Sequence, residues 1–291
     1  MIFNHPSELL FRILTTTAVM ARTQQAERVR KLQKALGRHH SESKANRDDD
    51  LLEYRRFLQT MQESLPPEVA HMTARDLEAL PEYQRWVSAR SSLLFLHGRN
   101  DESWPVPQSW LSLAAVDLVE HLRASDNKPL VVFQRCSPED TSQDVIKGLI
   151  SQLLDLEPSV VKEADDMRDL ELRVSADDDP SSSHRRDTDG NLLDDYSRAL
   201  TSIVDKCPRQ VNLVINRPEL CMGGNLMWGF VKALLRSVQD TKVKVILVVR
   251  TELWDIESRL CDLDEAALDS DSCELVVLRL HQYESNGADR Y

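Results

Sequence analysis

The stretch that decides the fold is Ser92–Leu122, "SLLFLHGRNDESWPVPQSWLSLAAVDLVEHL". An apolar run ends at Gly98, a polar turn follows, and apolar residues then recur at helical spacing. Nucleotide-binding α/β proteins are built in this order, because the start of a helix after a strand can hold phosphate. The stretch therefore indicates an architecture, and it raises the question of whether a phosphate grip is present.

Short aliphatic runs recur along the rest of the chain. They are nearly continuous in Val, Leu and Ile, which is typical of strands that are covered on both faces in a parallel sheet. The runs are "SLLFL" (92–96), "PLVVFQ" (129–134), "VNLVI" (211–215), "VKVILVV" (243–249) and "ELVVLRL" (274–280). Helix candidates alternate with them, at 109–123, 142–155, 192–206, 227–239 and 252–261. This alternation predicts a three-layer α/β fold with right-handed crossovers and a parallel sheet.

The part before the first strand is predicted to be helical. An amphipathic helix is expected within residues 1–37, a polar linker at 38–50 and a helical connector at 51–90, in which Thr73 opens the last helix. A mitochondrial transit peptide would also be amphipathic and arginine-rich, but the glutamates and the periodicity of the first segment favour a surface helix.

The α/β domain is expected to occupy residues 91–284, followed by a tail at 285–291. Residues 164–190 interrupt its rhythm with Asp, Ser, Pro and Arg, and they are expected to form a disordered acidic insertion.

Composition narrows the functional classes. The net charge is −12, and residues 155–195 carry 14 acidic and 5 basic residues, a net of −9. Such a surface repels phosphate backbones, so nucleic acid is not an expected partner. The five cysteines are widely spaced and show no zinc-ligand pattern, which favours a reducing, cytoplasmic location. No apolar run is long enough to predict a membrane span.

Four stretches carry a resemblance to a known family. They are "LPEYQRWVSARSSLLFLHG" (80–98), "PLVVFQRCSPEDTSQDVIKGLISQLLDLEP" (129–158), "DKCPRQVNLVINRPELC" (205–221) and "VKVILVVRTELWDIESRL" (243–260). In order and spacing, residues 75–285 resemble the NACHT-type P-loop NTPase module of STAND proteins, especially the nephrocystin-like version of fungal NLR-like receptors. The resemblance implies an NTP site at the carboxyl ends of parallel strands, with a Lys for the phosphates and a hydroxyl and an acid for Mg²⁺.

The phosphate loop departs from the family pattern. Gly98 matches its first glycine. In one register Trp104 then takes the place of the Lys and Pro105 that of the hydroxyl. In a longer register Leu111 stands for the Lys and Ser112 for the hydroxyl. Neither register supplies a cation.

The acidic and sensor motifs depart as well. Asn216 takes the place of the Mg²⁺-linked Asp, Glu219 that of the second acid, and Leu220 that of the Glu that polarises water. Arg250 keeps the sensor arginine, which would meet a phosphate or form an ion pair with Glu219 or Glu252.

The resemblance and its defects together predict a function. The nucleotide site is expected to be vestigial, built from Gly98, Ser112, Asn216, Glu219 and Arg250, with no catalytic residue, no metal and no cofactor. We expect a non-hydrolysing module that acts as an interaction or regulatory scaffold for protein partners, with self-association as a further option. One alternative is a switch that binds ATP or GTP weakly with Mg²⁺; another is a fragment of a larger receptor.

Overall fold

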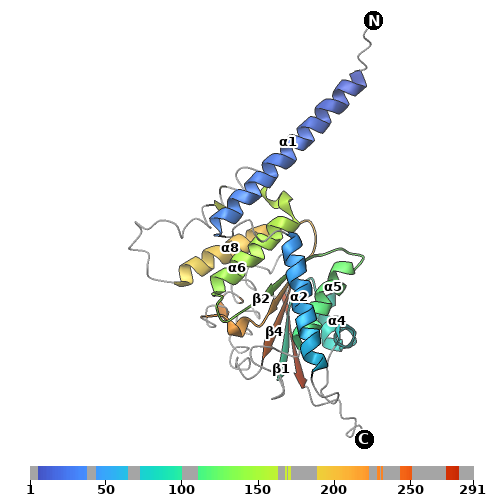
Figure 1. The fold of residues 1–291 in the computed structure, drawn as a ribbon, viewed down its shortest axis with the longest axis vertical. Helices are drawn as coiled ribbons and strands as arrows, with labels where there is room; N and C mark the ends of the chain where they lie inside the picture. The colour runs from blue at the N-terminus through green and yellow to red at the C-terminus, as the bar shows by residue number, and fades with distance from the viewer. Residues whose placement is uncertain are drawn as a thin grey trace.

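The fold was analysed in a computed structural model of the chain (Figure 1). The structure describes residues 6–37, 44–64, 73–99, 111–162, 168, 170–171, 189–222, 228–229, 231, 243–250 and 273–281. The phosphate-loop segment 100–110, the predicted helix 252–261, the tail and most of the predicted insertion 164–190 lie outside these residues.

The five predicted strands are confirmed, and they form one sheet. They are β1 (Ser91–Arg99), β2 (Leu130–Arg135), β3 (Val211–Asn216), β4 (Val243–Arg250) and β5 (Cys273–His281). The strand order is β2-β3-β4-β1-β5, and every pairing is parallel. The chain is therefore an α/β protein whose β4 lies between β3 and β1, in agreement with the predicted fold class.

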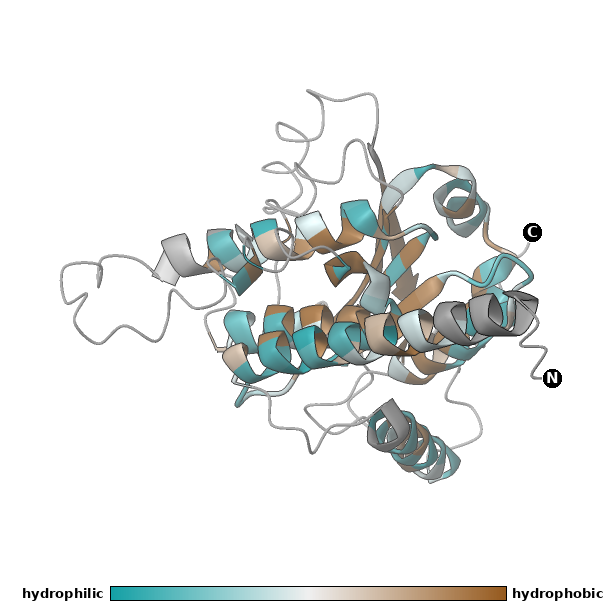
Figure 2. Ribbon diagram, turned by 90° about the horizontal axis from the view of Figure 1, so that it is seen from above, coloured by the Kyte–Doolittle hydropathy of each residue, from teal (hydrophilic) through white to brown (hydrophobic). Residues whose placement is uncertain are grey.

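Helices cover both faces of the sheet, because alternate residues along each strand point to opposite sides. On one face, Phe95, Leu213 and Leu247 pack with α6 (Ser142–Leu156) and α8 (Asp189–Lys206). On the other, Leu94, Val214 and Ile246 pack with α5 (Leu111–Ala124) and with apolar side chains from residues 51–86. Seen from above, the helices turn their apolar sides towards the sheet (Figure 2). The three layers follow from these two cores.

Helix α1 (Pro6–Ala35) projects from the body (Figure 1). Val29 and Leu32 near its end, and Leu36 just after it, join the core on the α6 face. The chain leaves this helix through Gly37, whose φ of 70° is a left-handed conformation that glycine adopts without strain.

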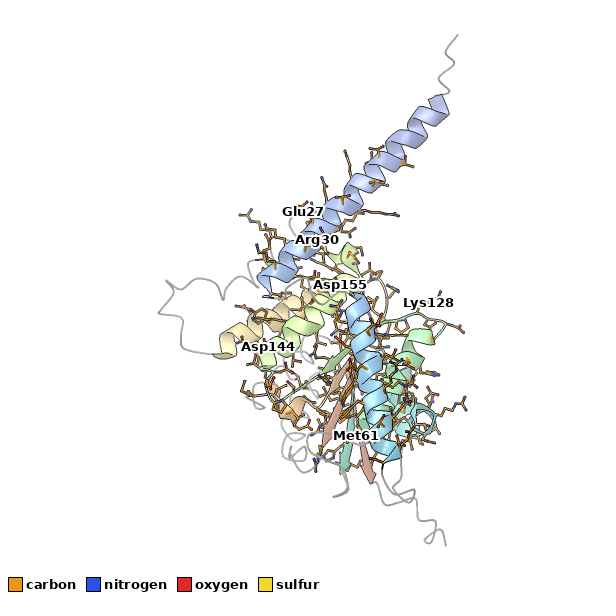
Figure 3. The ribbon with its side chains drawn as sticks, viewed as in Figure 1. Glu27, Arg30, Met61, Lys128, Asp144 and Asp155 are labelled. Atoms are coloured by element: carbon orange, nitrogen blue, oxygen red, sulfur yellow. The ribbon has the colours of Figure 1, made fainter. Side chains whose placement is uncertain are left out.

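Helix α2 (Lys44–Glu63) corrects the predicted linker, because Lys44 to Asp50 are helical. Ala45 is the one apolar residue in this segment, so no helical period of apolar residues is visible there. Ion pairs from the body stabilise it instead: Arg47 pairs with Asp155 of α6, and Asp48 with Arg123 of α5 at 3.1 Å. Figure 3 shows Asp155 at the end of α6, near α1 and α2.

The predicted helix that opens at Thr73 is two helices, α3 (Ala74–Glu78) and α4 (Pro81–Ser88). Thr73 caps α3 as predicted, by accepting a hydrogen bond from the Asp76 N–H at 3.3 Å. Pro81 separates the two helices, since it has no N–H to donate and is favoured at the first position of a new helix.

Among the described residues, no helix is long and apolar enough to cross a bilayer.

Candidate functional site

The predicted site residues converge at the carboxyl end of the sheet. Gly98 is paired in register with Arg250 on the neighbouring strand, and Asn216 is paired with Val248. The helix after β1 lies on one face of the sheet, whereas α6 and α8, which follow β2, lie on the other. In open α/β sheets, the place where successive connections diverge to opposite faces is where ligands bind. The five residues therefore lie where the topology expects a ligand.

A buried hydrogen-bond network occupies the first part of this place. The Ser112 hydroxyl, in the first turn of α5, donates to Asn216 Oδ1 at 3.1 Å. Asn216 Nδ2 donates to the Tyr54 hydroxyl of α2 at 3.1 Å. All three residues are buried. The amide of Asn216 is thus engaged on both its oxygen and its nitrogen.

Tyr54 brings aromatic bulk to the same spot. Its ring lies 6.4 Å from that of Phe133, and the Arg135 guanidinium lies 4.9 Å from its centroid. Burial raises the pKa of the Tyr54 phenol, against the opposing effects of Ser112, Arg135 and Asn216. The hydroxyl therefore stays protonated at neutral pH and is held as a neutral partner of the network.

A buried ion pair occupies the second part. Arg217 Nε pairs with Glu219 Oε1, and that oxygen also accepts the Arg250 backbone N–H at 3.2 Å. Arg217 has a left-handed backbone with a φ of 67°, which turns the chain sharply after β3. Burial raises the pKa of the Glu219 carboxyl, while the Arg217 charge and hydrogen bond lower it. The structure thus pairs Glu219 with the Arg217 side chain and with the Arg250 backbone.

Two of these residues, Tyr54 and Arg135, were missed by sequence reasoning. Tyr54 belongs to an apolar stripe with Leu51 and Leu58, which is a signal of burial but not of destination. Arg135 ends the aliphatic strand β2, and that position was the available signal. Their convergence depends on strand order, which the sequence does not state.

The site offers little to a metal ion. The described residues contain no cluster of three or more His, Cys, Asp or Glu side chains that could hold one. Mg²⁺ prefers carboxylate oxygens with water. Asn216 and Ser112 supply neutral oxygens that already take part in hydrogen bonds.

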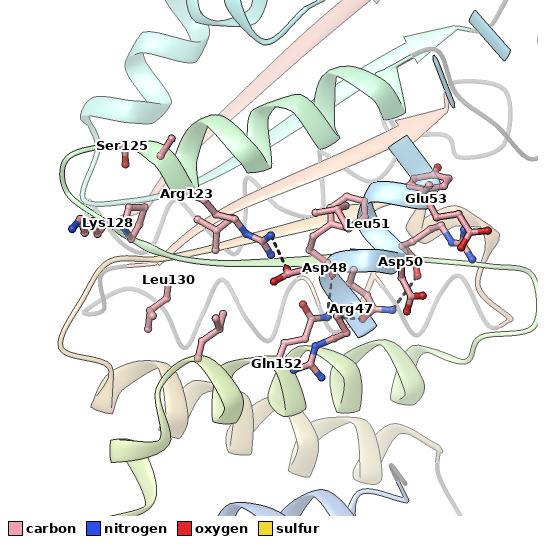
Figure 4. A pocket seen from close by; sticks show the side chains of 18 of the residues that line it. Arg47, Asp48, Asp50, Leu51, Glu53, Arg123, Ser125, Lys128, Leu130 and Gln152 are labelled. Carbon is pink, nitrogen blue, oxygen red and sulfur yellow. Dashed lines mark hydrogen bonds and ion pairs between the residues drawn. The ribbon is translucent and has the colours of Figure 1, made fainter. Parts of the chain in front are cut away.

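A groove lies beside this network, between α2 and the edge strand β2 (Figure 4). Its volume is about 1320 Å³, and its lining includes Arg47, Leu51, Tyr54, Phe133, Arg135 and Gln152. Gln152 Nε2 donates to the Phe133 carbonyl at 3.0 Å, so a side chain replaces the neighbouring strand at this edge. This amide occupies one backbone acceptor of the edge strand, which limits unwanted strand pairing there.

No known family model matches the chain, and neither a curated protein nor a solved structure is significantly similar to it.

Proposed function

We propose that the chain is a NACHT-like α/β module that does not hydrolyse NTP and serves as an interaction or regulatory scaffold. The observation that carries this proposal is the Ser112–Asn216–Tyr54 network, which lies where a nucleotide-bound Mg²⁺ would need free oxygen ligands. The order of the motifs and the five-stranded parallel sheet support the family; the occupied site supports the loss of hydrolysis.

The energetics favour this interpretation. Phosphoryl transfer depends on prepositioned charge, and removal of one such donor costs about 2.7–4 kcal/mol of transition-state stabilisation. The metal-binding acid is replaced by Asn216, and the Glu219 oxygen that could substitute for it is paired with Arg217. For Mg²⁺ to bind, these buried bonds would have to break first.

The scaffold role is supported by the shape of α1. Residues 15–27 of this helix are almost all exposed, among them Val19 and Met20 at 61% and 63%. Most helical stability in proteins comes from tertiary packing, which these exposed residues lack within the described chain, so a protein partner would stabilise the helix. We propose this helix as one partner-binding element.

A weak nucleotide switch is the second candidate. Arg250 lies in register beside Gly98 at the end of the central strands, which is where a phosphate would need a cation. Its backbone N–H is held by Glu219, so the residue has a fixed position. ATP or GTP would then bind through Arg250 and backbone donors.

Isothermal titration separates the two candidates. The full chain at high micromolar concentration is titrated with millimolar ATP, ADP and GTP, with and without Mg²⁺. The scaffold proposal expects no binding heat with any of them. Micromolar, Mg²⁺-dependent binding that Arg250→Ala abolishes would contradict it and establish the switch.

A further inference from the structure

Two buried thiols meet at the carboxyl end of the sheet. Cys136 directly follows β2, and Cys221 directly follows η3 (Pro218–Leu220), the turn after β3. They are 3% and 4% exposed. Both belong to the same buried core cluster, and their thiols interact with each other although 85 positions separate the residues in the chain.

The backbone holds both cysteines in place. The Cys136 N–H donates to the Asn216 carbonyl at 2.9 Å, which continues the β2–β3 pairing. The Cys221 N–H donates to the Pro218 carbonyl at 3.2 Å, and Met222 forms a parallel bridge with Thr141. The Met222 N–H donates to the Asp140 carbonyl at 2.9 Å. Each thiol is therefore flanked by hydrogen bonds that tie its segment to the segment of the other.

We propose that Cys136 and Cys221 are a redox modification site, which closes to an intramolecular disulfide when a small disulfide or diazene oxidant is present. One thiolate attacks the oxidant to give a mixed adduct, and the second thiolate displaces it with formation of the S–S bond. Two thiols are oxidised, and the oxidant takes up two electrons and two protons. A disulfide oxidant leaves as two thiols, and a diazene leaves as a hydrazine.

The bond would fix the turn that carries the buried ion pair. Arg217 and Glu219 lie between Asn216, at the end of β3, and Cys221. A link from Cys221 to Cys136 would fasten that turn to the end of β2, next to the Asn216 network. This site does not depend on whether a nucleotide binds, so it goes beyond the proposed scaffold function.

The environment also sets the rate. Burial, followed by the hydrogen bond to Cys221, raises the pKa of the Cys136 thiol well above its usual value. Because the thiolate is the attacking species, oxidation is expected to be slow at pH 7 and faster at pH 9.

The test is peptide mapping of the native wild-type chain after treatment with diamide at pH 8.5. Free thiols are blocked before digestion under non-reducing conditions. We expect a Cys136–Cys221 peptide pair that disappears on reduction, and a rise in the thermal unfolding midpoint of several degrees, up to about 10 °C, because the link closes a long loop. Cys207, which donates to the Ile203 carbonyl at 3.3 Å on α8, serves as the internal control and should stay unlinked.

Two results would overturn the proposal. One is recovery of both cysteines as blocked free thiols after prolonged oxidation at pH 9. The other is a disulfide that joins either of them to a different cysteine. Cys207→Ser/Cys261→Ser/Cys273→Ser repeats the measurement with only the two thiols present; it should form the same link, and the Cys136→Ser version of it should show neither link nor midpoint shift.

Discussion

At the scale of single residues, Tyr54 is the side chain from α2 that contacts Asn216 in the candidate site. Its hydroxyl accepts a hydrogen bond from Asn216 Nδ2. Removal of the hydroxyl would leave this buried donor without its Tyr54 partner. We expect Tyr54→Phe to lower the free energy of unfolding by about 1–2 kcal/mol, as measured by urea denaturation.

Tyr83→Phe is the matched control for this substitution. Tyr83 is also buried, and its hydroxyl makes no hydrogen bond to another described residue. Equal stability of the two variants would show that the Asn216–Tyr54 bond contributes nothing.

Lys244 is a buried lysine at the opposite end of β4. Its ammonium donates to the Trp86 carbonyl at 3.1 Å and to the Val87 carbonyl, and it lies 5.1 Å from the centroid of the Trp86 ring. Desolvation lowers the pKa of Lys244 to about 8, from 10.5. The folded state therefore loses this proton at lower pH than the unfolded state does.

The sign of the pH dependence follows from that shift. From about pH 8 to about pH 10.5 the unfolded chain binds more protons, so stability rises with pH in this window. Between pH 7 and 9, the free energy of unfolding of the wild type should rise by about 1 kcal/mol relative to that of Lys244→Met. Because both proteins contain the same cysteines, the comparison removes the contribution of cysteine titration. Parallel pH profiles of the two proteins would refute the assignment.

Asp155 links three helices at the scale of elements. Its carboxylate accepts from Gln33 of α1 at 2.8 Å and pairs with Arg47 of α2. It lies in the last turn of α6, where the helix dipole disfavours a negative charge, so these partners offset an unfavourable position.

We expect Asp155→Ala to loosen two helices at once. Hydrogen exchange should accelerate in residues 29–36 and 44–54, and global stability should fall by about 1–2 kcal/mol, because two hydrogen bonds to a charged group are lost. Asp195→Ala removes an exposed pair with Arg198 at 3.9 Å and should change neither quantity. Exchange that is unchanged at α2 would mean that Arg47 does not hold its first turns.

At the scale of the whole molecule, helix α4, which precedes β1, packs into the core of the sheet. Trp86 of α4 is 1% exposed, and it belongs to the same core as Leu94 and Ile246 of the sheet. Loss of a large buried side chain costs about 3–5 kcal/mol.

Trp86→Ala should therefore lower the midpoint of a single unfolding transition of the whole chain. The transition is measured by circular dichroism during a denaturant titration. The neighbouring Val87, which is 42% exposed, is the control, and Val87→Ala should be nearly neutral. A separate early transition, with the sheet unfolding as before, would show instead that the helical connector is an independent unit.

The sequence by itself determined the strands, most of the described helices and five of the residues that meet at the carboxyl edge. Continuous Val, Leu and Ile runs are a local signal of strands covered on both faces, and the Thr73 cap and Gly37 are local signals of helix ends. The sequence does not predict the first turns of α2, because ion pairs with distant residues stabilise them. No local pattern encodes such partners.

Only the tertiary structure decided what fills the candidate site. Tyr54 reaches Asn216 across 162 positions, and Cys136 meets Cys221, because the strand order brings the ends of β2 and β3 together under α2. A side chain's burial can be inferred from periodicity, but its partner depends on how the elements pack. The defects of the nucleotide motifs were therefore legible in the sequence, whereas the network that occupies their place was not.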